Sequence, residues 1–161
     1  MGLFGAIDTS ASGLTAQRLR LDLIANNIAN INSNRTAETT PGGNPIPYRR
    51  QMAVFVPRPP EKSFASLFGK TLQEQSVGKG VQVSSVTQDQ TPFRLEYNPD
   101  SPDAVKVAEP GIPVGYVRQP NVNITTEMVD MISASRAYEA NVTALNASKS
   151  MAMKALEIGK G

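Results

Sequence analysis

The feature that most constrains this chain is a long stretch near its C-terminus that contains neither Pro nor Gly. The stretch runs from Asn121 to Ile158. Apolar residues recur along it at steps of three and four, which places them on one face of an α-helix. One heptad series falls at positions 128, 135, 142, 149 and 156, and the other at 131, 138, 145 and 152. The pattern predicts a long amphipathic helix of the coiled-coil type over residues 123–158.

The opposite face of this expected helix carries small residues. Positions 137, 140, 144 and 147 all hold Ala, where a solvent-facing helix normally carries Lys and Glu. A helix with an apolar stripe on one face and small residues on the other favours neighbours on both sides. At 1.5 Å per residue it would span roughly 50 Å, which is longer than a domain of this size needs. We therefore expect it to pack among other helices.

A second and weaker heptad pattern covers residues 3–32. Its apolar members lie on two series with seven-residue spacing and include Ile7, Leu14, Leu21, Ile28, Ile24 and Ile31. Three early glycines and several late asparagines lower the helix propensity of this stretch. We expect a helix that depends on its neighbours for stability. The alternative is an ordinary core helix of a small bundle.

Four asparagines lie within seven residues at the end of this pattern, namely Asn26, Asn27, Asn30 and Asn32. Amide groups are costly to bury unless they are paired, and when they are paired they fix the register of neighbouring elements. The alternative is that these residues mark a fraying helix end. The residues alone favour neither interpretation.

The middle of the chain, residues 36–120, predicts a small, Pro-rich β region with a thin core. Strands are expected at 48–56, from 81 onward and at 93–97, with short extended pieces near 105–107 and 116–117 and a short helix at 63–74. The expected fold is mainly α with this small β insert, and the long terminal helices form a coiled coil. Residues 1–35 and 121–161 would make a terminal helical domain, and 36–120 the insert.

Composition argues against catalysis and against several ligand classes. The chain has no Cys and no His, which removes thiol chemistry, the usual zinc ligands and the commonest general base. Gly69-Lys70-Thr71 resembles the end of a phosphate-binding loop, but Phe64 stands where that loop needs Gly. The net charge is only +2, without a basic stripe, so nucleic acid is not an expected partner. No enzyme activity, cofactor, metal or small-molecule substrate is predicted.

No apolar run approaches the length of a membrane span, and the N-terminus lacks the pattern of a cleaved secretory signal. Export of this chain would therefore need another route.

Both ends of the chain carry a family resemblance. Residues 12–22 and 24–30 resemble the N-terminal signature shared by flagellar axial proteins, and residues 120–123, 127–141 and 145–146 resemble the C-terminal pattern of proximal rod proteins. The chain is therefore similar to bacterial flagellar basal-body rod proteins.

The resemblance implies a structural subunit of the proximal rod, which transmits torque from the motor to the hook. Such proteins leave through the flagellar type III apparatus without a cleaved signal peptide, and they stack helically in the basal body, in the periplasmic or cell-wall region. Their terminal helices line an inner tube and the β region packs outside. The implied partners are copies of itself, other proximal and distal rod subunits, a rod-base adaptor and the export gate. The alternative is a coiled-coil adaptor or a secretion-associated binding module.

The two helical patterns and the resemblance together predict an assembly interface. Its residues share a place on one of the two long helices, and they are Ile7, Leu14, Leu21, Ile24, Asn26, Asn27, Ile28, Asn30, Ile31, Met128, Met131, Tyr138, Ala140, Val142, Ala144, Leu145 and Ala147.

Overall fold

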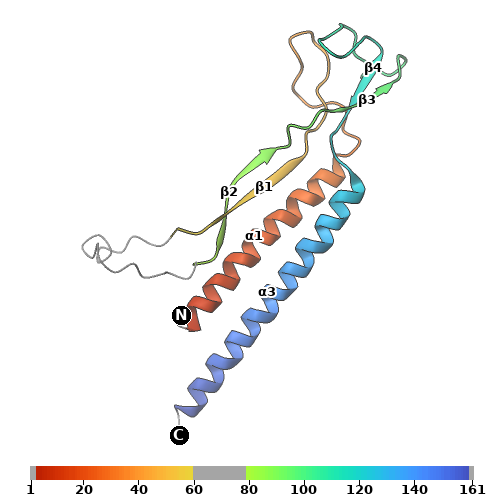
Figure 1. Cartoon of the computed structure of the whole chain (residues 1–161). Helices are drawn as coiled ribbons and strands as arrows, with labels where there is room; N and C mark the ends of the chain where they lie inside the picture. The colour runs from red at the N-terminus through yellow and green to blue at the C-terminus, as the bar shows by residue number, and fades with distance from the viewer. Residues whose placement is uncertain (1–2, 60–78, 160–161) are drawn as a thin grey trace, which may run out of the picture. The chain divides into compact units, whose positions relative to one another are not determined.

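Two long helices, one at each end of the chain, flank a small β region in the sequence. A computed structural model describes residues 3–59 and 79–159. Its elements, in chain order, are α1 (Leu3–Ala29), β1 (Gln51–Pro57), β2 (Val81–Gln88), β3 (Arg94–Tyr97), β4 (Tyr116–Gln119) and α3 (Ile124–Ile158) (Figure 1). The predicted fold, mainly α with a small β insert, is confirmed.

The observed bounds follow the sequence pattern closely at the helices and less closely at the first strand. The final helix begins at Ile124 and ends at Ile158, within one residue of the expected range. The strand expected from Tyr48 begins instead at Gln51, because the backbone N–H of Tyr48 bonds the carbonyl of Ser33, 2.9 Å away, rather than a neighbouring strand. The short helix expected at 63–74 lies outside the described residues.

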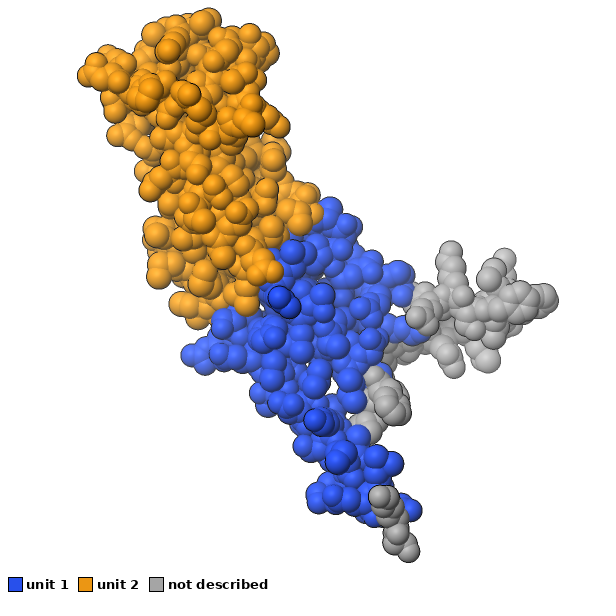
Figure 2. Space-filling view, turned by 180° about the vertical axis from the view of Figure 1, so that it is seen from behind, with its two compact units in different colours: residues 1–20, 53–85, 133–161 blue, residues 21–52, 86–132 orange. Residues whose placement is uncertain are grey.

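The chain divides into two compact units, which Figure 2 shows in separate colours. Unit 1 comprises residues 1–20, 53–85 and 133–161, and unit 2 comprises residues 21–52 and 86–132. The division runs across α1, β1, β2 and α3, so each unit contains part of both helices and part of the β region.

Unit 2 is built around a two-stranded antiparallel sheet. Strands β3 and β4 pair with Arg94 opposite Gln119 and Tyr97 opposite Tyr116. The rings of the two tyrosines meet edge to face, with their centroids 5.2 Å apart, a geometry that aromatic pairs favour. The apolar core is small, as the sequence predicted, and its buried side chains include Ile24, Ala104, Val105, Val117 and Val122.

Unit 1 brings the first part of α1 against the later part of α3 (Figure 1). The residues that are buried on these parts of the two helices are small, and they include Ser12, Gly13, Ala16, Ala134 and Ser148. A Cβ atom added at Gly13 would lie 2.9 Å from the side-chain oxygen of Asn141. The absence of a side chain at this position therefore allows the two helices to approach closely.

Candidate assembly interface

The ends of both helices that belong to unit 2 are fixed by asparagines. The side-chain oxygen of Asn123 accepts hydrogen bonds from the backbone N–H groups of Thr125 (2.9 Å) and Thr126 (3.3 Å), which caps the start of α3. At the end of α1, the side-chain amide of Asn30 donates to the backbone carbonyl of Asn26 at 2.9 Å. Asn26 and Asn30 thus follow the helix-end interpretation.

Asn27 follows the other interpretation, because it is buried and fully paired. Only 1% of its surface is exposed. Its side-chain oxygen accepts from the backbone N–H of Gln51 and from the hydroxyl of Tyr48, both at 2.9 Å. Its amide nitrogen donates to the carbonyl of Gln51 at 2.9 Å and to the carboxylate of Glu127 at 3.1 Å. These four bonds use the whole hydrogen-bonding capacity that fits an asparagine amide.

The carboxylate beside Asn27 belongs to a buried ion pair. Glu127 lies in the first turn of α3 and its side chain has 0% exposure, while Arg50 donates from Nε to its Oε1 at 2.5 Å. Arg50 also reaches Asp130 at 3.2 Å and Asp89 at 3.7 Å. Burial acts to lower the pKa of the Arg50 guanidinium, but the bond to Glu127 and the three nearby carboxylates outweigh it and raise that pKa. The guanidinium of Arg50 therefore stays charged.

Burial also raises the pKa of the Tyr48 phenol, and the negative charge of Glu127 adds to that effect. The hydroxyl of Tyr48 therefore remains protonated and can donate to Asn27.

Asn121 and Asn44 bind backbone groups in the same manner as Asn27. The side-chain oxygen of Asn121 accepts from the backbone N–H of Arg50 at 2.8 Å, and its nitrogen donates to the carbonyl of Asp89 at 3.1 Å. Asn44, which is 2% exposed, accepts from Lys106 N–H at 3.0 Å and donates to the carbonyl of Val107 at 2.9 Å. Each asparagine joins segments that are far apart in the chain.

Glu109 collects three donors at the edge of unit 2. Its carboxylate accepts hydrogen bonds from Thr40, Asn44 and Arg118. These bonds, led by that from Thr40, lower the pKa of Glu109 from 4.5 to about 2. The carboxylate also forms an ion pair with Arg118, whose side chain is 7% exposed. Glu109 thus holds its own segment to Thr40 and Asn44 and to β4.

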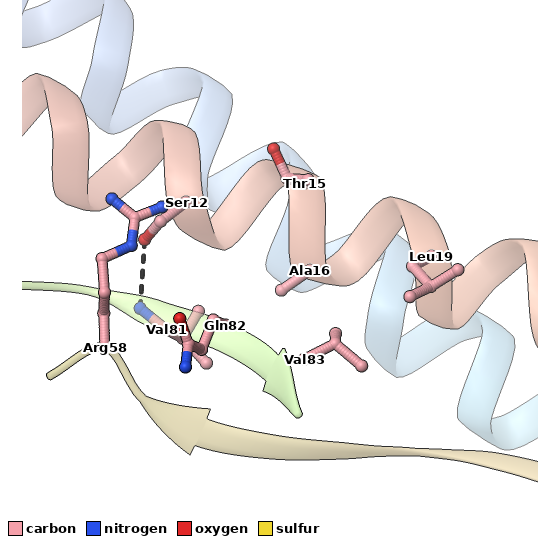
Figure 3. Close-up of a pocket in the computed structure, with 8 residues that line it drawn as sticks. All are labelled: Ser12, Thr15, Ala16, Leu19, Arg58, Val81, Gln82 and Val83. Carbon is pink, nitrogen blue, oxygen red and sulfur yellow. Dashed lines mark hydrogen bonds between the residues drawn. The ribbon is translucent and has the colours of Figure 1, made fainter. Parts of the chain in front are cut away.

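A pocket of about 270 Å³ lies within unit 1, between α1 and the start of β2 (Figure 3). The hydroxyl of Ser12 closes one end by accepting from the backbone N–H of Val81 at 3.1 Å. The charged lining residue, Arg58, points toward this end and pairs with Asp8 at 3.2 Å. The pocket is otherwise lined by apolar and small polar side chains, which suit packing rather than binding of a charged cofactor.

The apolar residues that the subunit does not cover lie mostly on α3. In unit 2 they include Ile124, Met128, Val129 and Ile132, and in unit 1 they include Met151, Met153, Leu156 and Ile158. Val129 is 62% exposed and Ile158 is 82% exposed. Exposed apolar residues gathered along one helix mark a surface that other molecules cover.

Within residues 3–59 and 79–159 no helix is long and apolar enough to cross a membrane. The same residues contain no group of three or more His, Cys, Asp or Glu that could hold a metal ion.

Comparison with known proteins identifies the family at both ends of the chain and along its whole length. Residues 7–34 match the family "Flagella basal body rod protein", and residues 114–158 match "Flagellar basal body rod FlgEFG protein C-terminal". The flagellar basal-body rod protein FlgC of Borreliella burgdorferi is 48% identical over the full length of both chains. The FlgC proteins of Bacillus subtilis and Salmonella typhimurium are 45% and 38% identical, over 99% of this chain and 100% of theirs.

The chain belongs to the FlgC family of flagellar basal-body rod proteins. The predicted resemblance is therefore confirmed. FlgC proteins are structural components of the rod, so the prediction of a structural, non-enzymatic protein of the flagellar basal body is also confirmed.

The residues predicted for the FlgC assembly interface differ widely in exposure. Of those on α1 and just after it, Ile24 and Asn27 are buried, Asn26 is exposed, and Ile7, Leu14, Leu21, Ile28, Asn30 and Ile31 are half-buried. Of those on α3, Met131, Val142 and Leu145 are half-buried, and Met128, Tyr138, Ala140, Ala144 and Ala147 are exposed. The exposed members are free to contact other molecules, whereas Ile24 and Asn27 face the inside of their own unit.

Sequence reasoning missed one row of contacts in this FlgC-family chain. The buried positions of α3 include Glu127, Ala134 and Ser148, each one residue before a member of the predicted heptad series at 128, 135 and 149. They escaped notice because they hold charged or small residues, and an apolar pattern does not register these. Sequence reasoning also missed that Arg50 pairs with Glu127, and that Asn44 and Asn121 bind backbone groups of distant segments.

Proposed function

We propose that this FlgC-family protein forms part of the wall of the proximal rod, where it stacks helically and transmits torque from the motor to the hook. Family membership makes it a structural rod protein. The observation that carries the assembly mode is the exposed apolar and small-residue surface of α3, which the subunit itself leaves uncovered. Contacts that repeat from subunit to subunit without closing by rotation generate open helical assemblies.

The two long helices pair as an antiparallel coiled coil in this proposal. Two contacts support it, one in each unit: Gly13 lies against Asn141, and Asn27 bonds Glu127. The step from Gly13 to Asn27 equals the step from Asn141 back to Glu127, as one continuous antiparallel register requires. Close approach at Gly13 suits such a pair.

The terminal segments, residues 1–35 and 121–161, form the inner tube, and residues 36–120 form an insert that packs outside it. The charge distribution supports this arrangement. Residues 1–34 and residues 121–161 each carry equal numbers of acidic and basic side chains, so copies can pack together without long-range repulsion.

The partners follow from a place in the rod. We expect copies of this chain, other proximal and distal rod subunits, the rod-base adaptor and the export gate, in the periplasmic or cell-wall region. The family resemblance supports export through the flagellar type III apparatus. The surfaces of α3 that meet these neighbours are the heptad face, with Met128 and Tyr138 exposed, and the opposite small-residue face, with Ala140, Ala144 and Ala147 exposed.

Substitution Ala144→Leu tests this face. Ala144 is exposed in the subunit, and Leu is a good helix former, so the free subunit should be unharmed. In a packed wall the larger side chain would cost about 1–3 kcal/mol at each interface. We expect secretion of the variant but loss of rods and of swimming.

The matched control is Ala37→Leu, at an exposed position of the insert, which should leave rods and swimming intact. Normal rods in cells that express Ala144→Leu would show that this face is free of neighbours and would overturn the proposed packing.

A further inference from the structure

The buried ion pair of unit 2 ties together three segments that lie far apart in the sequence. Arg50 precedes β1, Glu127 lies in α3 and Asn27 in α1, and the pairs Arg50–Glu127 and Asn27–Glu127 are 77 and 100 residues apart in sequence. The side chain of Arg50 is 19% exposed and that of Glu127 is fully buried. Both helices are therefore bound to adjacent residues at the start of β1, α3 to Arg50 by an ion pair and α1 to Gln51 by an amide.

The corresponding polar side chains of α3 in unit 1 bind in another way. Asn141 donates to the carbonyl of Ala137, and Ser148 donates to that of Ala144, so each returns to the backbone of its own helix. Bonds of this kind do not join α3 to any other segment. Asn141 and Ser148 thus stabilise α3 itself, whereas Glu127 joins α3 to Arg50 and Asn27.

We propose that Asn27, Arg50 and Glu127 act as a helix clamp in the unassembled subunit. The helix clamp holds residues 21–29 of α1 and 124–132 of α3 folded against the β region, so that these residues open far less often than the rest of either helix. It acts within one subunit and does not depend on rod assembly.

The helix clamp also sets the alignment of the two helices. Asn27 and Glu127 are 3.1 Å apart, and a slip of one helical turn would separate them by about 5.4 Å along the helix axis. That displacement exceeds the reach of a hydrogen bond. It would leave the Glu127 carboxylate without its Asn27 partner in a site that water does not reach, which is strongly unfavourable. A subunit can therefore close the clamp in one register only.

Hydrogen exchange of the full-length monomer tests the proposal. In the unsubstituted protein, amides of 21–29 and 124–132 should exchange at least tenfold more slowly than those of 5–20 and 133–158, as expected when the free energies of local opening differ between regions. Substitution Arg50→Met leaves Glu127 buried without its cation and should speed exchange in the clamped segments about a hundredfold or more. The control is Arg35→Met, which breaks a more exposed ion pair with Asp103. It should change the exchange rate in the clamped segments less than about fivefold.

A double-substitution cycle separates the ion pair from ordinary packing. Glu127→Leu alone leaves Arg50 without its buried partner, whereas Arg50→Met with Glu127→Leu leaves neither charge of this pair. The fold-increase in exchange rate of the double variant should therefore be smaller than the product of the fold-increases of the two single variants, by about tenfold or more. If Arg50→Met prevents folding altogether, recovery of a folded protein in the double variant supports the clamp. Uniform exchange along both helices, equal effects of Arg50→Met and Arg35→Met, or a double variant as damaged as the product, would each overturn it.

Discussion

Each of the two units of this rod protein is stabilised internally by a different kind of contact. In unit 2, the side chains of Asn27, Asn44 and Asn121 bind backbone groups of distant segments. In unit 1, α1 approaches α3 closely at Gly13, which has no side chain to hold Asn141 away. Directional bonds fix one arrangement within a single chain, whereas small residues supply close approach and little buried area.

The difference teaches which part of the subunit is complete by itself. Unit 1 leaves large apolar side chains uncovered at the end of α3, and Leu156 and Ile158 are 68% and 82% exposed. Unit 2 exposes large apolar side chains as well, among them Tyr97, Val129 and Ile132, but its asparagines and the Arg50–Glu127 pair join segments within the unit. We infer that unit 2 is stable in the isolated chain and that unit 1 gains most of its stability from neighbouring molecules.

The largest expected effect comes from Asn27→Leu, which keeps the size of the side chain and removes all four of its bonds. Buried groups of Gln51, Tyr48 and Glu127 would lose their partner, at about 1–3 kcal/mol for each unsatisfied group. We expect the free energy of unfolding, measured by urea titration, to fall by about 3 kcal/mol or more.

The adjacent Asn26→Ala is the control for Asn27→Leu, because Asn26 is exposed and its loss should cost less than about 1 kcal/mol. Equal effects of the two substitutions would contradict the special role of Asn27 and weaken the contrast between the units.

A smaller effect is expected from Gly80→Ala in unit 1. Gly80 has a positive φ of 100°, and an added Cβ would lie 2.2 Å from the hydroxyl of Ser12. The strain and the clash should together destabilise unit 1 by about 2–4 kcal/mol. Because we expect unit 1 to be ordered in only part of the free subunits, the effect on the whole population should be smaller. The exchange rate of the Val81 amide, which donates to Ser12, should therefore rise.

Gly43→Ala serves as the control for Gly80→Ala. Gly43 also has a positive φ, of 77°, but no atom lies within 4 Å of the added Cβ. Strain alone should cost about 1–2 kcal/mol there. If Gly80→Ala left the Val81 amide unchanged, the contact between Ser12 and β2 would not contribute to unit 1 in solution.

The smallest expected effect is a pH dependence of unit 2 from Glu109. Its folded pKa is about 2, below the ordinary value of 4.5, so the folded state binds this proton less readily than the unfolded state. The contribution to stability is full above pH 4.5 and disappears as the pH falls from 4.5 towards 2. Glu109→Gln should remove this part of the acid dependence in urea titrations at a series of pH values.

Glu38→Gln, at an exposed position, is the control for loss of one negative charge beside Glu109→Gln. An acid profile that Glu109→Gln leaves unchanged between pH 4.5 and 2 would show that the three donors around Glu109 do not act on the folded state.

The helices and their apolar spacing could be predicted from the sequence, because helical periodicity is a local signal. Met131 and Leu145 are half-buried and Ile24 is buried, whereas Tyr138 of the same series as Met131 is exposed. The row through Glu127 and Ala134 could not be predicted, because apolar patterns do not record a charged or a small residue at a contact. Arg50 could not be assigned to Glu127 either, since 77 residues separate them and no periodicity links positions that far apart.

The four asparagines within seven residues around the end of α1 illustrate the same limit. Composition left two interpretations open, and the structure uses both: Asn27 is buried and Asn30 binds the helix end. The two side chains take different roles because Asn27 lies inside α1, whereas Asn30 follows its last residue, Ala29.

The side-chain amide of Asn27 also affects whether strand β1 can pair with a strand of another chain. It binds both the N–H and the C=O of Gln51, the two groups by which the first residue of β1 would pair with an additional strand. The side chain of Asn27 thus bonds the backbone of Gln51 as a neighbouring strand would, and it prevents another strand from pairing at this residue. Unprotected edges recruit strands from other molecules and start aggregation. Because Asn27 occupies both backbone groups of Gln51, a strand from another chain has no free group to pair with at this residue.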